Sequence, residues 1–260
     1  MTAFPDAPAA ARRIRYAVLA GAVCTGLAAA LTGCSAEDPD AGTNGVGKLS
    51  AQKIESKARG AVSAADSVRL SGTIVSGGKT YQLDMLLKGA GGSGRVSTEA
   101  AGSFELLRVE KDLYLKADAA FWKDQGKKGE KAELGDDKSA AAGKLDDKYV
   151  KVPVGDPAYK QLSGFTDMEL LLDDLIVLHG ELSKEDRGEV GGSRTIRLAG
   201  GGGSGGTLDV SLEGKPFPLR FQRAGDAGEL RFADWNKDFD LLPPGKGDIV
   251  DYGEKIATTG

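Results

Sequence analysis

The stretch VRLSGTIVSGGKTYQLDMLL, residues 68–87, predicts two β-strands joined by a tight turn. After the glycine pair Gly77-Gly78, apolar residues occupy every second position, with polar Gln82 and Asp84 between them. Two alternating runs separated by two glycines are typical of a β-hairpin. Because each such strand has one apolar face, the stretch predicts an antiparallel sheet that covers a core with that face.

The same alternation recurs on both sides of the hairpin. It predicts further strands at Arg95–Glu99, Phe104–Val109, Leu113–Lys116, Tyr149–Val154, Arg194–Leu198, Thr207–Leu212, Phe217–Gln222 and Glu229–Ala233. Turns are expected at the small or polar stretches between them, namely Gly91–Gly94, Ala101-Gly102 and Lys111-Asp112. The glycine-rich run Gly200–Gly206 is expected to be a loose hairpin connection.

Two segments have helical spacing instead. Residues 50–65 place small and apolar residues on one face, with Ser50 as the expected N-cap, and residues 167–179 form a strongly apolar helix capped by Asp167. Together these elements predict an α+β fold, in which a large curved antiparallel sheet wraps two to three helices.

The N-terminal segment resembles a lipoprotein signal peptide. Arg12, Arg13 and Arg15 precede an uncharged apolar run, and Leu31-Thr32-Gly33-Cys34 is similar to a bacterial lipobox. The resemblance implies cleavage before Cys34 and acylation of its thiol. The chain would then associate with the membrane through this N-terminal lipid anchor.

Changes in composition along the chain predict its domain boundaries, and its net charge limits the classes of partner. We expect residues 1–33 to be a signal peptide, 34–49 a flexible tether, 50–245 one domain and 246–260 a tail. The charged stretch 123–148 is expected to be a solvated excursion. Loss of three arginines and one aspartate with the signal peptide changes the formal charge from −4 to −6. An acidic chain lacks the basic face that nucleic-acid binding requires.

The sequence offers little for catalysis or for a metal. His179 is the one histidine, and Cys34 is the one cysteine outside the signal peptide, so zinc and thiolate chemistry are not expected. Residues 89–94 fit G-x-G-x-x-G by letter, but a strand rather than a helix is predicted to follow. We therefore expect no cofactor and no enzymatic activity.

The apolar faces leave two interpretations open, a packed core or a hydrophobic cavity. The residues predicted to line such a cavity are Tyr81, Leu83, Met85, Phe104, Leu106, Leu113, Leu115, Leu172, Leu175, Ile176, Leu208 and Val210. Periodicity does not distinguish the two interpretations.

Over residues 50–245 the chain resembles the LppX/LprG-like lipoproteins of actinobacteria. The resemblance includes the lipobox and its Cys34, Leu113-Tyr114-Leu115 leading to Phe121-Trp122, the helix at 168–178, and Phe217-Pro218-Leu219 running into Phe232-Ala233-Asp234-Trp235. It implies a LolA-like half-barrel whose hydrophobic cavity holds the acyl chains of lipids or glycolipids.

Two functions are therefore expected from the sequence. The first is lipid binding or transport by a lipoprotein anchored at the extracytoplasmic face of the cell membrane. The alternative is an envelope interaction or regulatory lipoprotein with a filled core, a protein partner and no lipid ligand.

Overall fold

The computed structural model describes residues 38–89, 91–99, 102–122 and 143–250. The signal peptide, Cys34, most of the charged stretch 123–148 and the last ten residues lie outside these ranges. The chain divides into two units, Met1–Asp38 and Pro39–Gly260, and all the elements below belong to the second.

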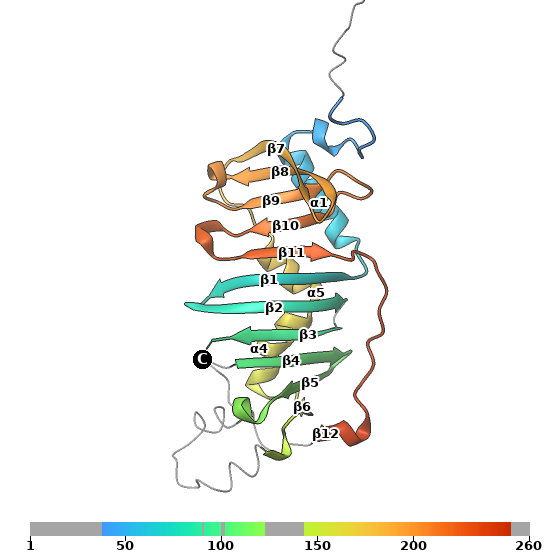
Figure 1. The fold of residues 1–260 in the computed structure, drawn as a ribbon, viewed down its shortest axis with the longest axis vertical. Helices are drawn as coiled ribbons and strands as arrows, with labels where there is room; N and C mark the ends of the chain where they lie inside the picture. The colour runs from blue at the N-terminus through green and yellow to red at the C-terminus, as the bar shows by residue number, and fades with distance from the viewer. Residues whose placement is uncertain (1–37, 90, 100–101, 123–142, 251–260) are drawn as a thin grey trace, which may run out of the picture. The chain divides into compact units, whose positions relative to one another are not determined.

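In the described ranges, twelve strands form one sheet, with the order β12-β6-β5-β4-β3-β2-β1-β11-β10-β9-β8-β7 (Figure 1). Every neighbouring pair is antiparallel except β12 and β6. The bounds are β1 Val68–Ser76, β2 Lys79–Lys88, β3 Gly91–Thr98, β4 Gly102–Val109, β5 Asp112–Ala117, β6 Lys148–Val152, β7 Leu182–Val190, β8 Ser193–Gly200, β9 Thr207–Ser211, β10 Pro218–Gln222, β11 Glu229–Ala233 and β12 Ile249–Val250.

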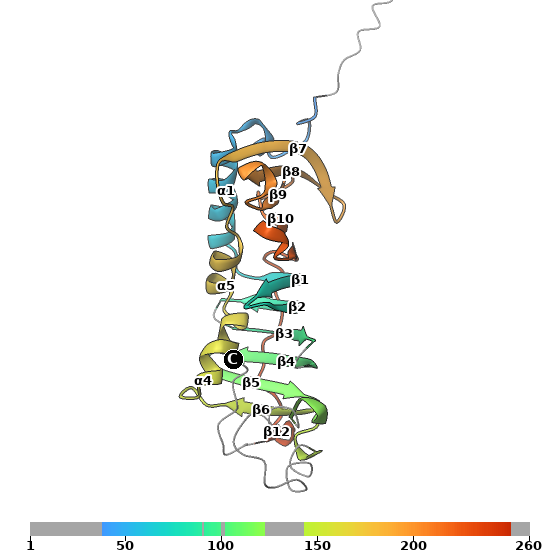
Figure 2. The same cartoon turned by 90° about the vertical axis from the view of Figure 1, so that its left-hand side faces the viewer.

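The helices α1 (Ala51–Ser63), α4 (Pro157–Ser163) and α5 (Met168–Leu175) lie on one face of this sheet (Figure 2). Short 3₁₀ turns are η1 Val46–Lys48, η2 Gly164–Thr166, η3 Gly201–Gly203, η4 Ala224–Asp226 and η5 Lys246–Asp248. The predicted fold class, a large antiparallel sheet with two to three helices, is confirmed.

The central hairpin forms as predicted. Val68 pairs with Leu87 and Ser76 with Lys79, which fixes the register of β1 and β2. Gly77 and Gly78 have φ angles of 56° and 71°, the left-handed backbone that a two-residue hairpin turn needs. The inner side chains of both strands, such as Leu70 and Leu83, are buried against the helices.

The glycine run expected as a turn before Arg95 lies instead inside strand β3. Gly92 pairs with Leu87, and Gly94 pairs with Met85. A Cβ on Gly94 would lie 2.2 Å from the Asp84 carbonyl oxygen and 2.7 Å from the Met85 sulfur. Glycine at these positions of β3 therefore allows close packing against the neighbouring strand. The sequence alone does not distinguish this use of glycine from its use in a turn.

The second predicted helix is shorter than residues 167–179. Asp167 is its N-cap as predicted, and its carboxylate accepts a hydrogen bond from the Leu170 N–H at 3.2 Å. The helix ends at Leu175, and His179 lies beyond it in a segment where its backbone N–H donates to the Gly205 carbonyl. The run Gly200–Gly206, expected to be loose, is tied by this bond and by Gly201 N–H to the Glu181 carbonyl.

The first helix begins as predicted but lacks the expected cap bond. Ser50 occupies the N-cap position of α1, and its side chain makes no capping hydrogen bond. The sequence also missed α4, β7 and β12. The pairing of β12 with β6 extends the domain to Val250, past the predicted boundary at 245.

Residues 39–49 belong to the domain rather than to a free tether. The Arg187 guanidinium pairs with the Asp40 carboxylate at 2.8 Å, and the Lys184 ammonium donates to the Gly47 carbonyl. Val46 is buried in the core cluster. The contacts of Arg187 and Lys184 lie along β7, one of the two edge strands, whose pairing with β8 shifts register between Lys184 and Arg187.

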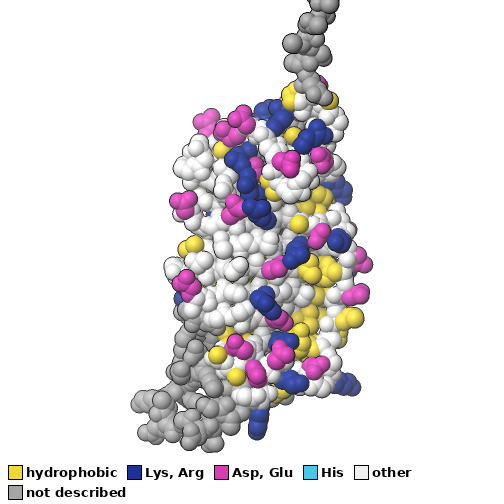
Figure 3. Space-filling view, viewed as in Figure 1, with side chains coloured by type: hydrophobic (Ala, Val, Ile, Leu, Met, Phe, Trp, Pro, Cys, Tyr) yellow, Lys and Arg dark blue, Asp and Glu magenta, His cyan; other side chains and the backbone are white. Residues whose placement is uncertain are grey.

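The face of the sheet without helices carries a row of charges, seen in Figure 3. Register partners from β8 to β5 follow one another as Arg197, Asp209, Arg220, Arg231, Ser71, Asp84, Arg95, Glu105 and Lys116. A hydrogen bond to Glu105 raises the pKa of the exposed Arg95 guanidinium. Opposite charges on adjacent strands favour this register over a slip by one residue.

Asp209 is the buried member of this row and carries a stability prediction. Its side chain is 2% exposed and accepts from Arg197 Nε at 3.0 Å and Arg220 Nε at 2.7 Å. Asp209→Asn should lower the free energy of unfolding by about 2 kcal/mol, because two part-buried guanidinium groups lose their countercharge. Urea unfolding measures this loss. Glu105→Gln, in an exposed pair of the same row, should cost less than about 1 kcal/mol, and equal costs would contradict the prediction.

Candidate functional site

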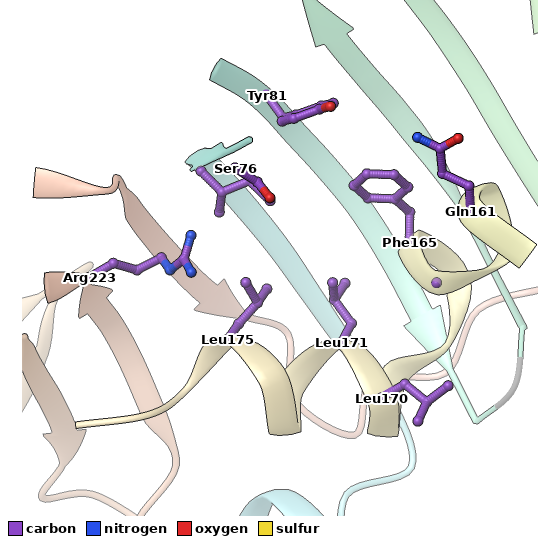
Figure 4. A pocket seen from close by; sticks show the side chains of 10 residues that line it. Ser76, Tyr81, Gln161, Phe165, Leu170, Leu171, Leu175 and Arg223 are labelled. Atoms are coloured by element: carbon purple, nitrogen blue, oxygen red, sulfur yellow. The ribbon is translucent and has the colours of Figure 1, made fainter. Parts of the chain in front are cut away.

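A pocket of about 460 Å³ lies between the β1–β2 hairpin and the segment η2–α5. Figure 4 shows it from close by. Its volume falls in the range of about 300–1,000 Å³ that is typical of small-molecule sites. Its lining residues are Ile74, Ser76, Tyr81, Gln161, Gly164, Phe165, Leu170, Leu171, Leu175 and Arg223.

The helical wall is formed by Leu171 and Leu175. Residues four apart lie on the same face of a helix, and in Figure 4 both side chains point into the pocket, whereas Leu170 points away. The N-terminus of α5 is held by the Asp167 cap and by an ion pair from Asp167 to Arg108 of β4 at 3.5 Å. The helix therefore presents its two leucines at a fixed position above the hairpin.

The sheet wall is formed by Ile74 and Tyr81, which are register partners across the hairpin and so share a face. The Tyr81 ring lies against the Phe165 ring, with centroids 6.0 Å apart and planes tilted by 41°. Phe165 belongs to η2, which lies over strand β3. A Cβ on Gly92 would lie 3.5 Å from the Thr166 carbonyl oxygen.

The pocket has a polar end at Arg223. Arg223 follows β10, and Figure 4 shows its guanidinium directed toward Ser76 and the space above Leu175. One of its terminal nitrogens donates to the Val75 carbonyl at 3.2 Å. Apolar walls with one cation at the end can hold an apolar or amphiphilic ligand, and they supply no nucleophile.

Two of the twelve residues predicted to line a cavity, Tyr81 and Leu175, do line this pocket. The other ten lie in the hydrophobic core cluster, to which Leu175 also belongs: Leu83, Met85, Phe104, Leu106, Leu113, Leu115, Leu172, Ile176, Leu208 and Val210. None of these ten residues lines the pocket between the hairpin and α5. Their burial among core residues favours a packed interior at these positions, and their role as cavity residues stays a prediction.

Sequence reasoning missed Phe165 and Arg223. Phe165 belongs to the turn between α4 and α5, where no helix was predicted, and Arg223 lies just past the end of a predicted strand. Only the fold brings them near Tyr81, which is 84 residues from Phe165 by number. No local sequence pattern around Phe165 or Arg223 indicates that they lie near Tyr81.

Within the described ranges, no group of three or more His, Cys, Asp or Glu side chains could hold a metal ion. His179 is exposed and is not among the residues that line the pocket. A search of the described residues for membrane-spanning helices finds none with sufficient length and apolarity.

Comparison with known proteins gives matches among solved structures. No family model and no curated protein matches the chain. LprF from Mycobacterium bovis is 14% identical with a TM-score of 0.46, and 75% of this chain and 96% of LprF are covered.

Two further solved structures also match this chain at low sequence identity. Lipoprotein LppX from Mycobacterium tuberculosis is 10% identical with a TM-score of 0.41, covering 73% of this chain and 97% of LppX. An uncharacterized protein from Thermus thermophilus is 13% identical with a TM-score of 0.34, covering 77% and 98%. The resemblance drawn from the sequence is to the group that contains LppX.

Proposed function

We propose that this protein binds hydrocarbon chains of a lipid in the pocket between the β1–β2 hairpin and α5. The observation that carries the proposal is a pocket of about 460 Å³ whose walls include Tyr81, Phe165, Leu171 and Leu175. Acylated Cys34 would hold the domain at the extracytoplasmic face of the membrane, next to the lipid it binds. The role is binding or transport, without catalysis.

Such a pocket suits reversible exchange with a bilayer. Exposing a chain to water costs about 0.8 kcal/mol per methylene, whereas transfer from bilayer to pocket replaces one apolar environment with another. The net free energy of transfer can therefore lie near zero. A carrier needs this balance because it must both load and release its ligand.

A tryptophan at Leu175 tests the pocket directly. Leu175→Trp should fill it, so the purified variant should carry at least about fivefold less lipid than the wild type while staying folded, since the indole gains an apolar environment. Organic extraction followed by mass spectrometry measures the bound lipid, and circular dichroism checks the fold.

Leu83→Trp is the matched control for the Leu175 variant. Leu83 is 2% exposed in the packed core, where overpacking should cost about 1–3 kcal/mol. The loss of stability should be larger for Leu83→Trp than for Leu175→Trp. If wild-type protein purified from its own membrane contains no lipid, the proposal fails.

The packing of the sheet interior favours a second candidate function. Ten residues predicted to line a cavity are core residues, as expected for an envelope interaction lipoprotein without a lipid ligand. That function predicts no extractable lipid and no lipid-dependent effect of Leu175→Trp. The same extraction experiment therefore separates the two candidates.

A further inference from the structure

Arg223 differs from the other arginines in the described part of the chain. The described part of the chain contains ten arginines. Nine of them form ion pairs with carboxylates, and Arg223 forms none. Its one side-chain hydrogen bond, 3.2 Å long, goes to the Val75 carbonyl. Most of its N–H donors are therefore left for another acceptor.

Two carboxylates, those of Asp226 and Glu229, lie near Arg223 but are not among the residues that line the pocket. They line a second groove together with Arg223, which forms an ion pair with neither. The Glu229 carboxylate accepts from Arg231 at 3.0 Å and from Gln222 at 3.3 Å. On the pocket side, the other polar side chains of the lining are those of Ser76, Tyr81 and Gln161, and all three are neutral groups.

The position of the Arg223 guanidinium in the pocket suits it to bind a polar group of a ligand. It lies at one end, and Leu175, Leu171 and Phe165 continue the wall away from it (Figure 4). A few polar groups at the end of an apolar pocket fix the orientation of a ligand. A guanidinium presents a planar fork of donors that fits the oxygens of a carboxylate or a phosphate.

We propose that the pocket selects amphiphiles with an anionic group, which Arg223 binds while the hydrocarbon chain lies along Leu175 and Leu171. The anionic group is a carboxylate or a phosphate, and the Ser76 hydroxyl is placed to donate a further hydrogen bond. This inference rests on the proposed function, since it assigns the ligand class of the same pocket.

Native mass spectrometry of the acylated full chain, released from detergent micelles, tests the proposal with matched ligands. Palmitate and methyl palmitate have the same chain, and only palmitate is an anion. The wild type should bind palmitate at least about tenfold more tightly, the size of one charge-assisted hydrogen bond. Palmitoyl lysophosphatidic acid, compared with palmitate, then shows which anion is preferred.

The variant Arg223→Gln should reduce this preference to about one while leaving methyl palmitate binding unchanged. Arg231→Gln, which removes a guanidinium from the helix-free face, should keep the wild-type preference. Inorganic phosphate alone should not bind measurably, because the chain supplies most of the affinity. A preference near one in the wild type, or an unchanged preference in Arg223→Gln, would overturn the inference.

The outcomes also separate this inference from the proposed function. Equal binding of palmitate and methyl palmitate leaves the lipid-binding proposal standing and rejects the role of Arg223. Binding of neither ligand by folded wild-type protein rejects both. Circular dichroism of each variant shows whether the fold is retained.

Discussion

Gly94→Val should prevent strand β3 from pairing with β2 and lower the free energy of unfolding by more than about 4 kcal/mol. The first added carbon would lie 2.2 Å from the Asp84 carbonyl oxygen and 2.7 Å from Met85 Cα. Both atoms belong to the backbone of the neighbouring strand, so no change of rotamer relieves the overlap. The Met85 side chain, fully buried, would also have to leave its place over Gly94.

Gly60→Ala is the control for the glycine variant. Gly60 lies in α1, where an added Cβ would meet nothing within 4 Å. Alanine there should stabilise the protein by about 0.5–1 kcal/mol because it is the better helix former. Urea unfolding followed by circular dichroism measures both variants, and a Gly94→Val protein as stable as wild type would contradict the packing described for β3.

Cys34→Ala should move the protein from the membrane fraction to the soluble fraction or leave it unprocessed. The thiol is the proposed attachment point of the acyl chains, and two or more chains are needed for firm anchoring. Without the thiol, the apolar run of the uncleaved signal peptide is the remaining attachment. The expected loss of mature, membrane-bound protein is complete.

Labelling with radioactive palmitate measures the Cys34 prediction. The wild type should incorporate label and the Cys34→Ala variant should incorporate none. Cys24→Ala is the matched control, because Cys24 lies in the segment expected to be cleaved, and this variant should be labelled like the wild type. An unlabelled wild-type protein would contradict the lipobox interpretation.

Most of the strands could be predicted from sequence because an antiparallel strand with one buried face has its own period-two signal. The β1–β2 hairpin is the clearest case, since Leu83 and Met85 alternate with polar residues and Gly77 permits the turn. Strand β7 carries no such signal. Its residues are mostly exposed at the sheet edge, so no apolar face is required.

The pocket could not be predicted because it depends on where the helical segments lie. A buried leucine such as Leu83 and a pocket leucine such as Leu175 look alike in sequence. The difference arises from the position of η2, which places Phe165 against Tyr81. The glycines of β3 were a separate difficulty, because turns and close packing use the same residue.

The shifted register in β7 has a consequence for neighbouring molecules. An open sheet ends in a row of amide and carbonyl groups to which a strand of a second copy can add. Here the edge strand β7 has an irregular register between Lys184 and Arg187. An ion pair to Asp40 and a hydrogen bond to Gly47 hold the N-terminal segment of the domain against β7. Copies concentrated on a membrane by the proposed anchor are thus expected to remain separate rather than join edge to edge into fibres.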